Sequence, residues 1–150
     1  MRVQRATTAD DLASIVDAIN AAQWDDANAI EVYEATALAA YLERQDTVFL
    51  TCHEGKDVSP LLGMASARIE MKPYGRGLWL YVDEMDVCVD HRRRGVGQAL
   101  MTALLQIAED AGCEELWLGT EVDNTAANAL YTSMQPDAVD RLVGYTYETD

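Results

Sequence analysis

Residues 83–112 constrain the fold of this chain more than any other stretch of its sequence. Their first part, "DEMDVCV", is predicted to be a β-strand, in which Glu84 and Asp86 share one face. From Gly95 onward the apolar residues recur instead at helical spacing, on one face made of Val96, Leu100, Leu104, Ile107 and Ala108. Because "DHRRRGVG" separates the two parts, a strand must run through an arginine- and glycine-rich turn directly into a helix.

The rest of the chain predicts the other elements of an α/β fold. Strands are predicted over 2–6, 47–54, 61–71, 77–89, 115–122 and 142–150, and helices over 7–19, 30–44, 95–112 and 124–134. The order is β-α-α-β-β-β-α-β-α-β. Because a long hairpin precedes a strand-helix-strand crossover, we expect a mixed central β-sheet flanked by helices. With 150 residues and no repeat or linker, the chain is predicted to form a single domain, 1–150.

The chain is strongly acidic, which limits its partners. Its 26 Asp and Glu residues outnumber 11 Lys and Arg residues, for a net charge of −15. Such a surface repels nucleic acid and anionic lipid and favours cationic partners, so we expect neither nucleic-acid nor membrane binding. An acidic, arginine-rich composition is also expected of proteins soluble in high salt, in which acidic clefts occur everywhere.

Cysteine usage and the N-terminus favour a cytoplasmic protein. Cys52, Cys88 and Cys113 lie in apolar runs without a CxxC spacing, which predicts neither a disulfide framework nor a metal site. The N-terminal segment lacks the apolar stretch and cleavage site of a signal peptide. No stretch approaches the ~20 apolar residues that span a bilayer.

The arginine-glycine turn is a candidate phosphate site. The first turn of a helix leaves N–H groups unpaired at the positive end of the helix dipole, and glycine lets a phosphate approach the backbone. Two familiar nucleotide motifs fit poorly. A Walker A loop needs Lys-Ser or Lys-Thr after its last glycine, and a dinucleotide fingerprint needs a third glycine at position 100, which is Leu. The alternative interpretation is a solvated, charged turn.

Two segments, "MDVCVDHRRRGVGQALM" and "DNTAANALYTSM", resemble the GCN5-related N-acetyltransferase (GNAT) superfamily. The acetyl-CoA signature of that family, [QR]-x-x-G-x-[GA], is filled here by Arg92, Gly95 and Gly97. The later N-x-x-A-x-x-L-Y pattern is filled by Asn124, Ala127, Leu130 and Tyr131. The resemblance implies a GNAT fold and an acyltransferase that uses acetyl-CoA as co-substrate.

The resemblance also implies which residues bind acetyl-CoA. Backbone groups of Met85, Val87 and Val89 would pair with the pantetheine arm as a neighbouring strand would. The turn would hold the pyrophosphate through its backbone N–H groups and positive charge, from Arg92, Arg93, Arg94, Gly95, Val96, Gly97 and Gln98. Asn124 would contact the cofactor near the last strand.

The same resemblance implies direct attack of a neutral amine on the thioester. Tyr131 corresponds to the family's tyrosine near the thioester sulfur, a general acid that protonates the leaving thiolate. The amine must first lose a proton, and Glu84 is the first candidate base because it precedes the cofactor strand and shares a face with Asp86. Asp83 and Glu121 are further candidates. The alternative interpretation is that Tyr131 is an ordinary half-buried aromatic residue of a helix, and that Glu84 and Asp86 belong to a generally acidic surface.

The acceptor end departs from the family pattern. After Tyr131 the chain reads "TSMQPDAVDRL" instead of the usual "xKLGF" type, and the arrangement most resembles the aminoglycoside 3-N-acetyltransferase subgroup. Trp24, Asp25, Asp26 and Glu31 are candidates for an acceptor wall.

Several function hypotheses remain open. An N-acetyltransferase for a small cationic amine such as an aminoglycoside or polyamine is favoured. The alternatives are a peptide or protein N-acetyltransferase and a non-catalytic acyl-CoA-binding module. A homodimer formed through the C-terminal β-edge is a further hypothesis.

Overall fold

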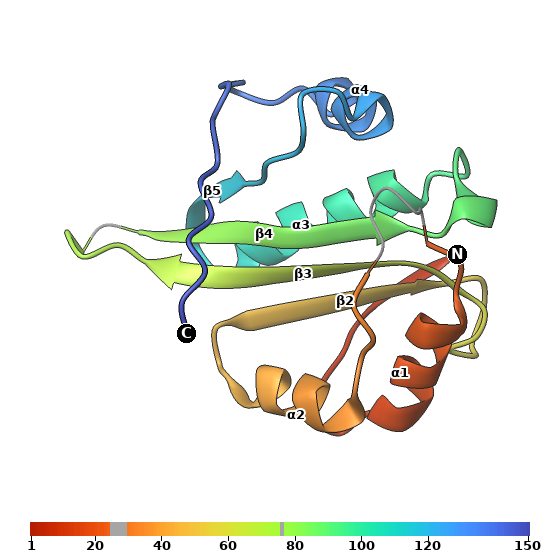
Figure 1. Cartoon of the computed structure of the whole chain (residues 1–150). Coiled ribbons are helices and arrows are strands. Elements are labelled where there is room, and N and C mark those ends of the chain that lie inside the picture. Colours follow the sequence, from red (N-terminus) through yellow and green to blue (C-terminus); the bar gives the residue numbers. More distant parts are fainter. Residues whose placement is uncertain (25–29, 76) are drawn as a thin grey trace. The chain divides into compact units, whose positions relative to one another are not determined.

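The computed structural model describes residues 1–24, 30–75 and 77–150 (Figure 1). Its strands are β1 (Arg2–Arg5), β2 (Thr47–His53), β3 (Leu61–Met71), β4 (Leu78–Val87) and β5 (Cys113–Trp117). Its helices are α1 (Leu12–Ala21), α2 (Ala35–Glu43), the short 3-10 helix η2 (Val89–His91), α3 (Val96–Asp110) and α4 (Thr125–Ser133). The predicted α/β order is confirmed from β1 to α4.

The strands form one mixed sheet in the order β1-β2-β3-β4-β5. Neighbouring strands are antiparallel, except that β5 pairs with β4 in parallel. A parallel pair cannot be joined by a tight turn, and α3 provides the crossover between β4 and β5. The predicted mixed sheet is therefore confirmed, with its parallel pair at the edge that β5 forms.

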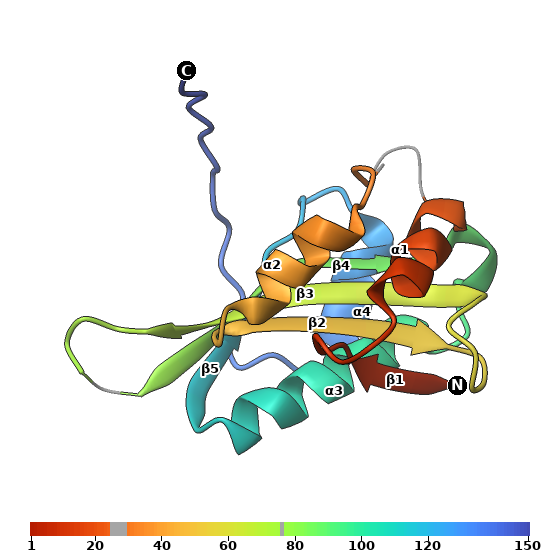
Figure 2. The same cartoon turned by 90° about the horizontal axis from the view of Figure 1, so that it is seen from below.

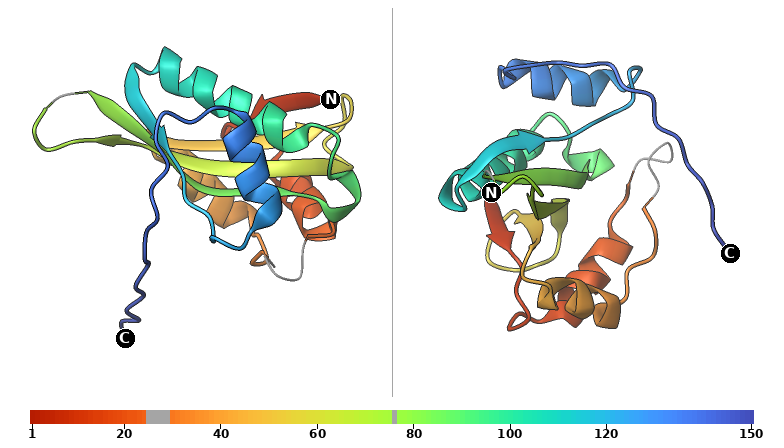
Figure 3. Two further views of the ribbon diagram at one scale, coloured as in Figure 1. Left: turned by 90° about the horizontal axis from the view of Figure 1, so that it is seen from above. Right: turned by 90° about the vertical axis from the view of Figure 1, so that its left-hand side faces the viewer.

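Helices cover both faces of this sheet (Figures 2 and 3). On one face, α1 and α2 share an apolar core with Phe49 of β2 and Met64 of β3. On the opposite face lies α3, which buries Leu100 and Leu104 completely. Among the described residues, no helix combines the length and apolar character needed to cross a bilayer.

The chain divides into two compact units, residues 1–118 and residues 119–150. The first unit contains the whole sheet with α1, α2 and α3, and all the buried residues belong to it. The second unit contains α4 and the C-terminal segment, and none of its residues is buried. The single domain over 1–150 stays a prediction.

The strand predicted over 142–150 is not formed, which corrects the expected order. The segment has the β-branched and aromatic residues that favour a strand. A strand also needs a neighbour that takes up its N–H and C=O groups, and residues 119–150 contain no other strand. The element order of the chain therefore ends at α4.

Candidate active site

The sheet opens along β4, because β5 is much shorter than its partner. Their pairing runs from Leu78 and Cys113 to Tyr81 and Trp117, where β5 ends. On that side of β4, no strand among the described residues pairs with 82–87. Half of the backbone groups in this part of β4 therefore lack a strand partner.

The register of β3 and β4 shows which groups these are. The N–H of Cys88 donates to the carbonyl of Leu62 at 2.9 Å, so the backbone groups of Cys88 point toward β3. Because successive residues of a strand direct these groups to opposite sides, those of Met85 and Val87 point toward the open side. The N–H of Val89 is already engaged, since it donates to the carbonyl of Gln23 at 3.0 Å.

The arginine-glycine turn follows directly and ends in a left-handed residue. Gly95 has φ +81°, and Arg93 two residues earlier has φ +62°. Gly95 is the N-cap of α3 and no side chain caps the helix. The first helical hydrogen bond runs from Ala99 N–H to the Gly95 carbonyl at 2.9 Å. The N–H groups of the first turn, before Ala99, therefore lie at the positive end of the helix without a helical partner.

A close contact between α3 and β3 holds this helix end near the end of β4. A Cβ at Gly63 would lie 2.8 Å from Val96 Cγ1 and 2.9 Å from the carbonyl oxygen of Asp86. Only a glycine lets the first turn of α3 approach so closely, and Val96 is buried there. The neighbouring Met64 points to the opposite face, in the α1 and α2 core.

The arginine side chains of the turn are exposed. Arg94 donates to both carboxylate oxygens of Glu54, at 2.8 and 3.0 Å, and contacts His91 Nδ1 at 3.1 Å. An exposed ion pair of this kind contributes little stability, and the Glu54 carboxylate offsets part of the positive charge of Arg94. Glu54 was not found by sequence reasoning, since only the fold brings it here from the end of β2.

Two carboxylates of β4 lie on the face that α1 and α2 cover. Glu84 pairs across the strands with Ser66, and Asp86 pairs with Met64 of the α1 and α2 core, so both side chains share that face. Burial, and next to it the charge of Glu84, raise the pKa of Asp86 to about 6. Glu84 itself is exposed.

Tyr33, a residue that the sequence did not suggest, stands near these two acids. Its ring packs on Phe49 with the centroids 6.0 Å apart. Burial raises the pKa of Tyr33 to about 12, and the charges of Glu84 and Asp86 add to the effect. Only the packing of the segment before α2 over the sheet reveals this neighbourhood, because 51 positions separate Tyr33 from Glu84 in the sequence.

Asp83, a further candidate base, is held by an arginine. Arg68 Nε donates to Asp83 Oδ2 at 2.9 Å and Arg68 Nη2 donates to Oδ1 at 3.1 Å. Arg68 also donates to Glu70. The Asp83 carboxylate is therefore already engaged by a side chain of the protein, whereas no such arginine pair is formed by Glu84 or Asp86 among the described residues.

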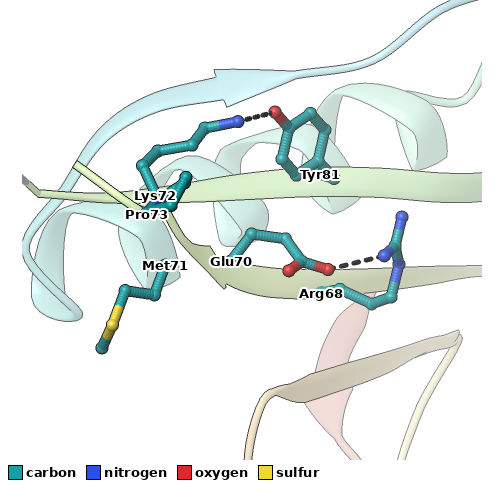
Figure 4. Close-up of a pocket in the computed structure, with 6 residues that line it drawn as sticks. All are labelled: Arg68, Glu70, Met71, Lys72, Pro73 and Tyr81. Atoms are coloured by element: carbon teal, nitrogen blue, oxygen red, sulfur yellow. Dashed lines mark hydrogen bonds and ion pairs between the residues drawn. The ribbon is translucent and has the colours of Figure 1, made fainter. Parts of the chain in front are cut away.

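A shallow hollow lined by residues of β3, β4 and their hairpin lies on the same face (Figure 4), next to a row of aromatic rings. The ring centroids of Trp79 and Tyr81 are 6.0 Å apart, and those of Tyr81 and Trp117 are 6.1 Å apart. Lys72 donates to the Tyr81 hydroxyl, and its Nζ lies 4.1 Å from the Trp79 centroid. Lys72, Tyr81 and Arg68 line the hollow, which has a volume of about 390 Å³.

The remaining candidates from the sequence lie on and before α4 in the second unit, and after α1 in the first unit. Asn124 and Tyr131 are on α4 in the second unit, where Asn124 Oδ1 caps the helix by accepting the Ala127 N–H at 3.1 Å. Glu121 precedes α4 and its carbonyl accepts from Asn128. Trp24 donates its Nε1–H to the Ile19 carbonyl, whereas Asp25 and Asp26 lie outside the described residues.

The profile of the acetyltransferase (GNAT) family matches residues 10–135 of the chain. N-acetyltransferase 8 of Homo sapiens is 33% identical over 95 residues, which are 63% of this chain and 40% of that protein. N-alpha-acetyltransferase MAK3 of Arabidopsis thaliana is 31% identical over 83 residues, 55% of this chain and 40% of that protein. The chain thus spans about two fifths of the length of these curated relatives.

Solved structures share the fold over nearly the whole chain. An aminoglycoside acetyltransferase from an uncultured soil metagenomic sample, in complex with sisomicin, has a TM-score of 0.82 at 18% identity and covers 99% of this chain and 96% of its own. An acetyltransferase of Trypanosoma brucei has a TM-score of 0.70 at 21% identity, over 97% of this chain and 99% of its own. The predicted GNAT fold is confirmed by this likeness.

The Asp86 environment generates a first prediction. The pKa of Asp86 is expected near 6, and Glu84→Gln is expected to lower it because the variant removes a negative neighbour of a half-buried acid. The raised pKa means that the neutral form stabilises the fold. The contribution of Asp86 to the free energy of unfolding is fully present below about pH 4 and is lost as the pH rises through about 6. NMR titration of the Asp86 carboxyl carbon measures the pKa directly.

The matched control is Glu109→Gln on α3, which lies on the other face of the sheet and should leave the titration of Asp86 unchanged. An Asp86 carboxyl that titrates at the same pH with and without the Glu84 charge would contradict the proposed coupling.

Proposed function

Because this chain belongs to the acetyltransferase (GNAT) family, we propose that it transfers the acetyl group of acetyl-CoA to the nitrogen of a small cationic amine. The amine nitrogen attacks the thioester carbonyl carbon directly. A C–N bond forms, the C–S bond breaks, and the CoA sulfur leaves with the electron pair. The amine gives up one proton and the thiolate takes up another, so the step needs a base and an acid.

The observation that carries the proposal is the uncapped first turn of α3 beside the open side of β4. Gly95, in its left-handed conformation, exposes the N–H groups of this turn to an incoming anion. Arg92, Arg93 and Arg94 bring three cationic side chains to this turn in a chain of net charge −15, and Arg94 shares its charge with Glu54. We assign the turn, through Val96, Gly97 and Gln98, to the pyrophosphate of acetyl-CoA.

The open side of β4 is assigned to the pantetheine arm. The backbone groups of Met85 and Val87 point toward that side, and an amide-bearing chain can pair with them as a strand does. For Val89 we assign only the carbonyl to the pantetheine arm, since its N–H donates to the carbonyl of Gln23. This arrangement would lead the arm from the turn along the sheet toward Glu84.

We propose that Glu84 and Asp86 together accept the proton of the amine. Their side chains share the face of the sheet that α1 and α2 cover, and two neighbouring carboxylates attract an ammonium ion before one of them deprotonates it. A pKa of about 6 leaves Asp86 ionised at neutral pH yet basic enough to share the proton. Glu84 stays the first candidate base, with Asp86 as its partner.

Tyr131 is proposed as the general acid that protonates the leaving thiolate, and Asn124 as a further cofactor contact. Both lie on α4, Tyr131 within the helix and Asn124 at its N-cap. The cap bond uses the side-chain oxygen of Asn124, and we assign the cofactor contact to its amide nitrogen.

The proposed acceptor is a small polycation, such as an aminoglycoside or a polyamine. The carboxylates of β4 and the acidity of the whole chain favour such a molecule, and the structural relative described above is an aminoglycoside acetyltransferase. A second candidate acceptor is a peptide N-terminus, which the likeness to an N-alpha-acetyltransferase favours.

The test is thiol release from acetyl-CoA with a panel of aminoglycosides, polyamines and short peptides. We expect the highest kcat/KM with the polycations, and a decline of that value as salt screens the acidic face. Higher kcat/KM for peptides would support the second acceptor class instead. Tight acetyl-CoA binding without turnover on any amine would contradict the proposed enzyme and favour a non-catalytic acyl-CoA-binding module.

Tyr131→Phe tests the general acid. Loss of the hydroxyl is expected to lower kcat by about 10²-fold or more, because the thiolate must then leave unprotonated. The acetyl-CoA dissociation constant should stay nearly the same, which separates a chemical role from a binding role. Tyr74→Phe, at an exposed tyrosine, is the matched control and should leave kcat unchanged. A Tyr131→Phe enzyme with unaltered kcat would remove Tyr131 from the mechanism.

Gly95→Ala tests the phosphate assignment. No atom lies within 4 Å of a Cβ at this position, so the effect comes from the φ of +81° and from the Cβ placed in the path of the phosphate. A left-handed residue with a side chain costs about 1–2 kcal/mol, so we expect the free Gly95→Ala chain to relax its turn out of this conformation. Binding must then restore the turn, which weakens acetyl-CoA binding by about 5- to 30-fold in calorimetry. Gly55→Ala, where φ is not left-handed and the space is open, should bind normally. Unchanged affinity in Gly95→Ala would refute the assignment.

A further inference from the structure

An ammonium group lies over two aromatic rings at the base of the β3–β4 hairpin. Lys72 Nζ is 4.1 Å from the ring centroid of Trp79 and 4.8 Å from that of Tyr81, and it donates a hydrogen bond to the Tyr81 hydroxyl. All three residues belong to the first unit, residues 1–118. Two aromatic faces and a hydroxyl oxygen together attract a primary ammonium ion. Trp79 and Tyr81 are called the cation clamp below.

Lys72 is only weakly held in this clamp. The hydrogen bond to Tyr81 raises the pKa of Lys72, so the side chain is positively charged at neutral pH. In the described part of the chain, however, no carboxylate forms an ion pair with Lys72. Its charge sits on a flexible four-carbon stem, and a cation–π contact at a partly exposed site is weak. A competing cation can therefore displace it.

The hollow described above lies next to the clamp. Lys72 and Tyr81 line one side of it, and Glu70 and Arg68 line the other (Figure 4). Its volume of about 390 Å³ is within the ~300–1,000 Å³ that is usual for small-molecule sites. Because Lys72 lies over the ring of Trp79, an outward movement of Lys72 would join the hollow to that ring.

The indole N–H of Trp79 indicates what else a ligand would carry. The Nε1 atom is buried, and no described residue accepts its hydrogen. A buried donor without an acceptor destabilises the fold. An ammonium group cannot satisfy it, because both groups only donate. A hydroxyl or ether oxygen close to the ammonium group of a ligand can.

We propose that the cation clamp binds an ammonium group of the acceptor, and that Lys72 occupies the clamp in the free chain as a tethered competitor. An amino sugar has both groups that the clamp selects. Its ammonium group would replace that of Lys72, and a neighbouring oxygen would accept the Trp79 N–H. The clamp therefore favours aminoglycosides over polyamines, which carry no oxygen. This inference rests on the proposed function, because it takes the ligand to be the acceptor.

The place of the clamp on β4 sets the spacing of two amino groups in the acceptor. Tyr81 pairs across the strands with Arg68, and Glu84 pairs with Ser66, so the irregular pairing after Ser66 puts Tyr81 and Glu84 on one face. Three residues of a strand span about 10 Å. The matching acceptor has a second ammonium group about 10 Å from the nitrogen that attacks near Glu84.

The first test is an NMR titration of the indole N–H groups in the full chain without acetyl-CoA. Its probes are sisomicin, spermidine and trehalose, which represent an aminoglycoside, a polyamine and a neutral sugar. Sisomicin should shift the Trp79 signal downfield, because its N–H gains an acceptor. Trp24, whose N–H already donates to the Ile19 carbonyl, should keep its signal. A Trp79 signal that saturating sisomicin leaves unchanged, or that trehalose shifts equally, would overturn the proposal.

Lys72→Met tests the tethered competitor, because methionine keeps a long side chain without the charge. Calorimetry should show sisomicin binding about 2- to 5-fold tighter, the factor that corresponds to a cation–π contact at an exposed site. Lys72→Arg, which restores a cation over the rings, should bind as the wild type does. The matched control, Lys56→Met, removes the same charge from the exposed loop between β2 and β3. Equal tightening in both methionine variants, or none in Lys72→Met, would refute the competition.

Trp79→Phe tests the selection of an oxygen, because phenylalanine keeps an aromatic face but has no N–H. Sisomicin binding should weaken by about 2- to 10-fold, the usual worth of one hydrogen bond, and spermidine binding should change less. An equal loss for both probes would refute the preference for aminoglycosides.

These binding measurements separate the clamp from the reaction. Sisomicin that binds at Trp79 without being acetylated would support the clamp and contradict the proposed transfer. Sisomicin that is acetylated while the Trp79 signal stays unchanged would support the transfer and overturn the clamp.

Discussion

The contact between α3 and β3 at Gly63 sets the position of the groups around the arginine-glycine turn. A single Cβ at this position would collide with Val96 and with the backbone of Asp86. Its absence lets the helix start against the sheet, directly after β4 ends. The uncapped turn at Gly95 and the open side of β4 therefore follow each other directly, as the proposed acetyl-CoA site requires. The anion binding that we propose for the turn rests on local geometry, but the placement of the turn beside β4 depends on this packing.

The second constraint is the unequal length of the two parallel strands. β5 ends opposite Tyr81, whereas β4 continues to Val87, so a stretch of sheet is left with backbone groups on one side and acidic side chains on one face. In the proposed function, this combination would bring the pantetheine arm of acetyl-CoA and a cationic amine to the same strand. The proposed transfer of an acetyl group to an amine follows from that juxtaposition and from the family match.

Three neighbouring acids on β4 show how the fold differentiates residues that look alike in the sequence. Asp83 is tied to Arg68, Glu84 is exposed, and Asp86 is half-buried with a raised pKa. Sequence reasoning identified the pair of Glu84 and Asp86 from the alternation of a strand. It did not find Tyr33, which reaches the two acids only through tertiary packing.

The sequence by itself determined the order of the elements from β1 to α4 and the glycine turn that starts α3, because periodicity, glycine conformation and helix ends act over a few residues. It wrongly predicted a strand over 142–150, since strand propensity is local but strand pairing is not. Only the tertiary structure decided that β4 has an open side, that Asp86 is half-buried and that Arg68 forms an ion pair with Asp83. These properties depend on burial and on neighbours from distant parts of the chain, which no local pattern contains.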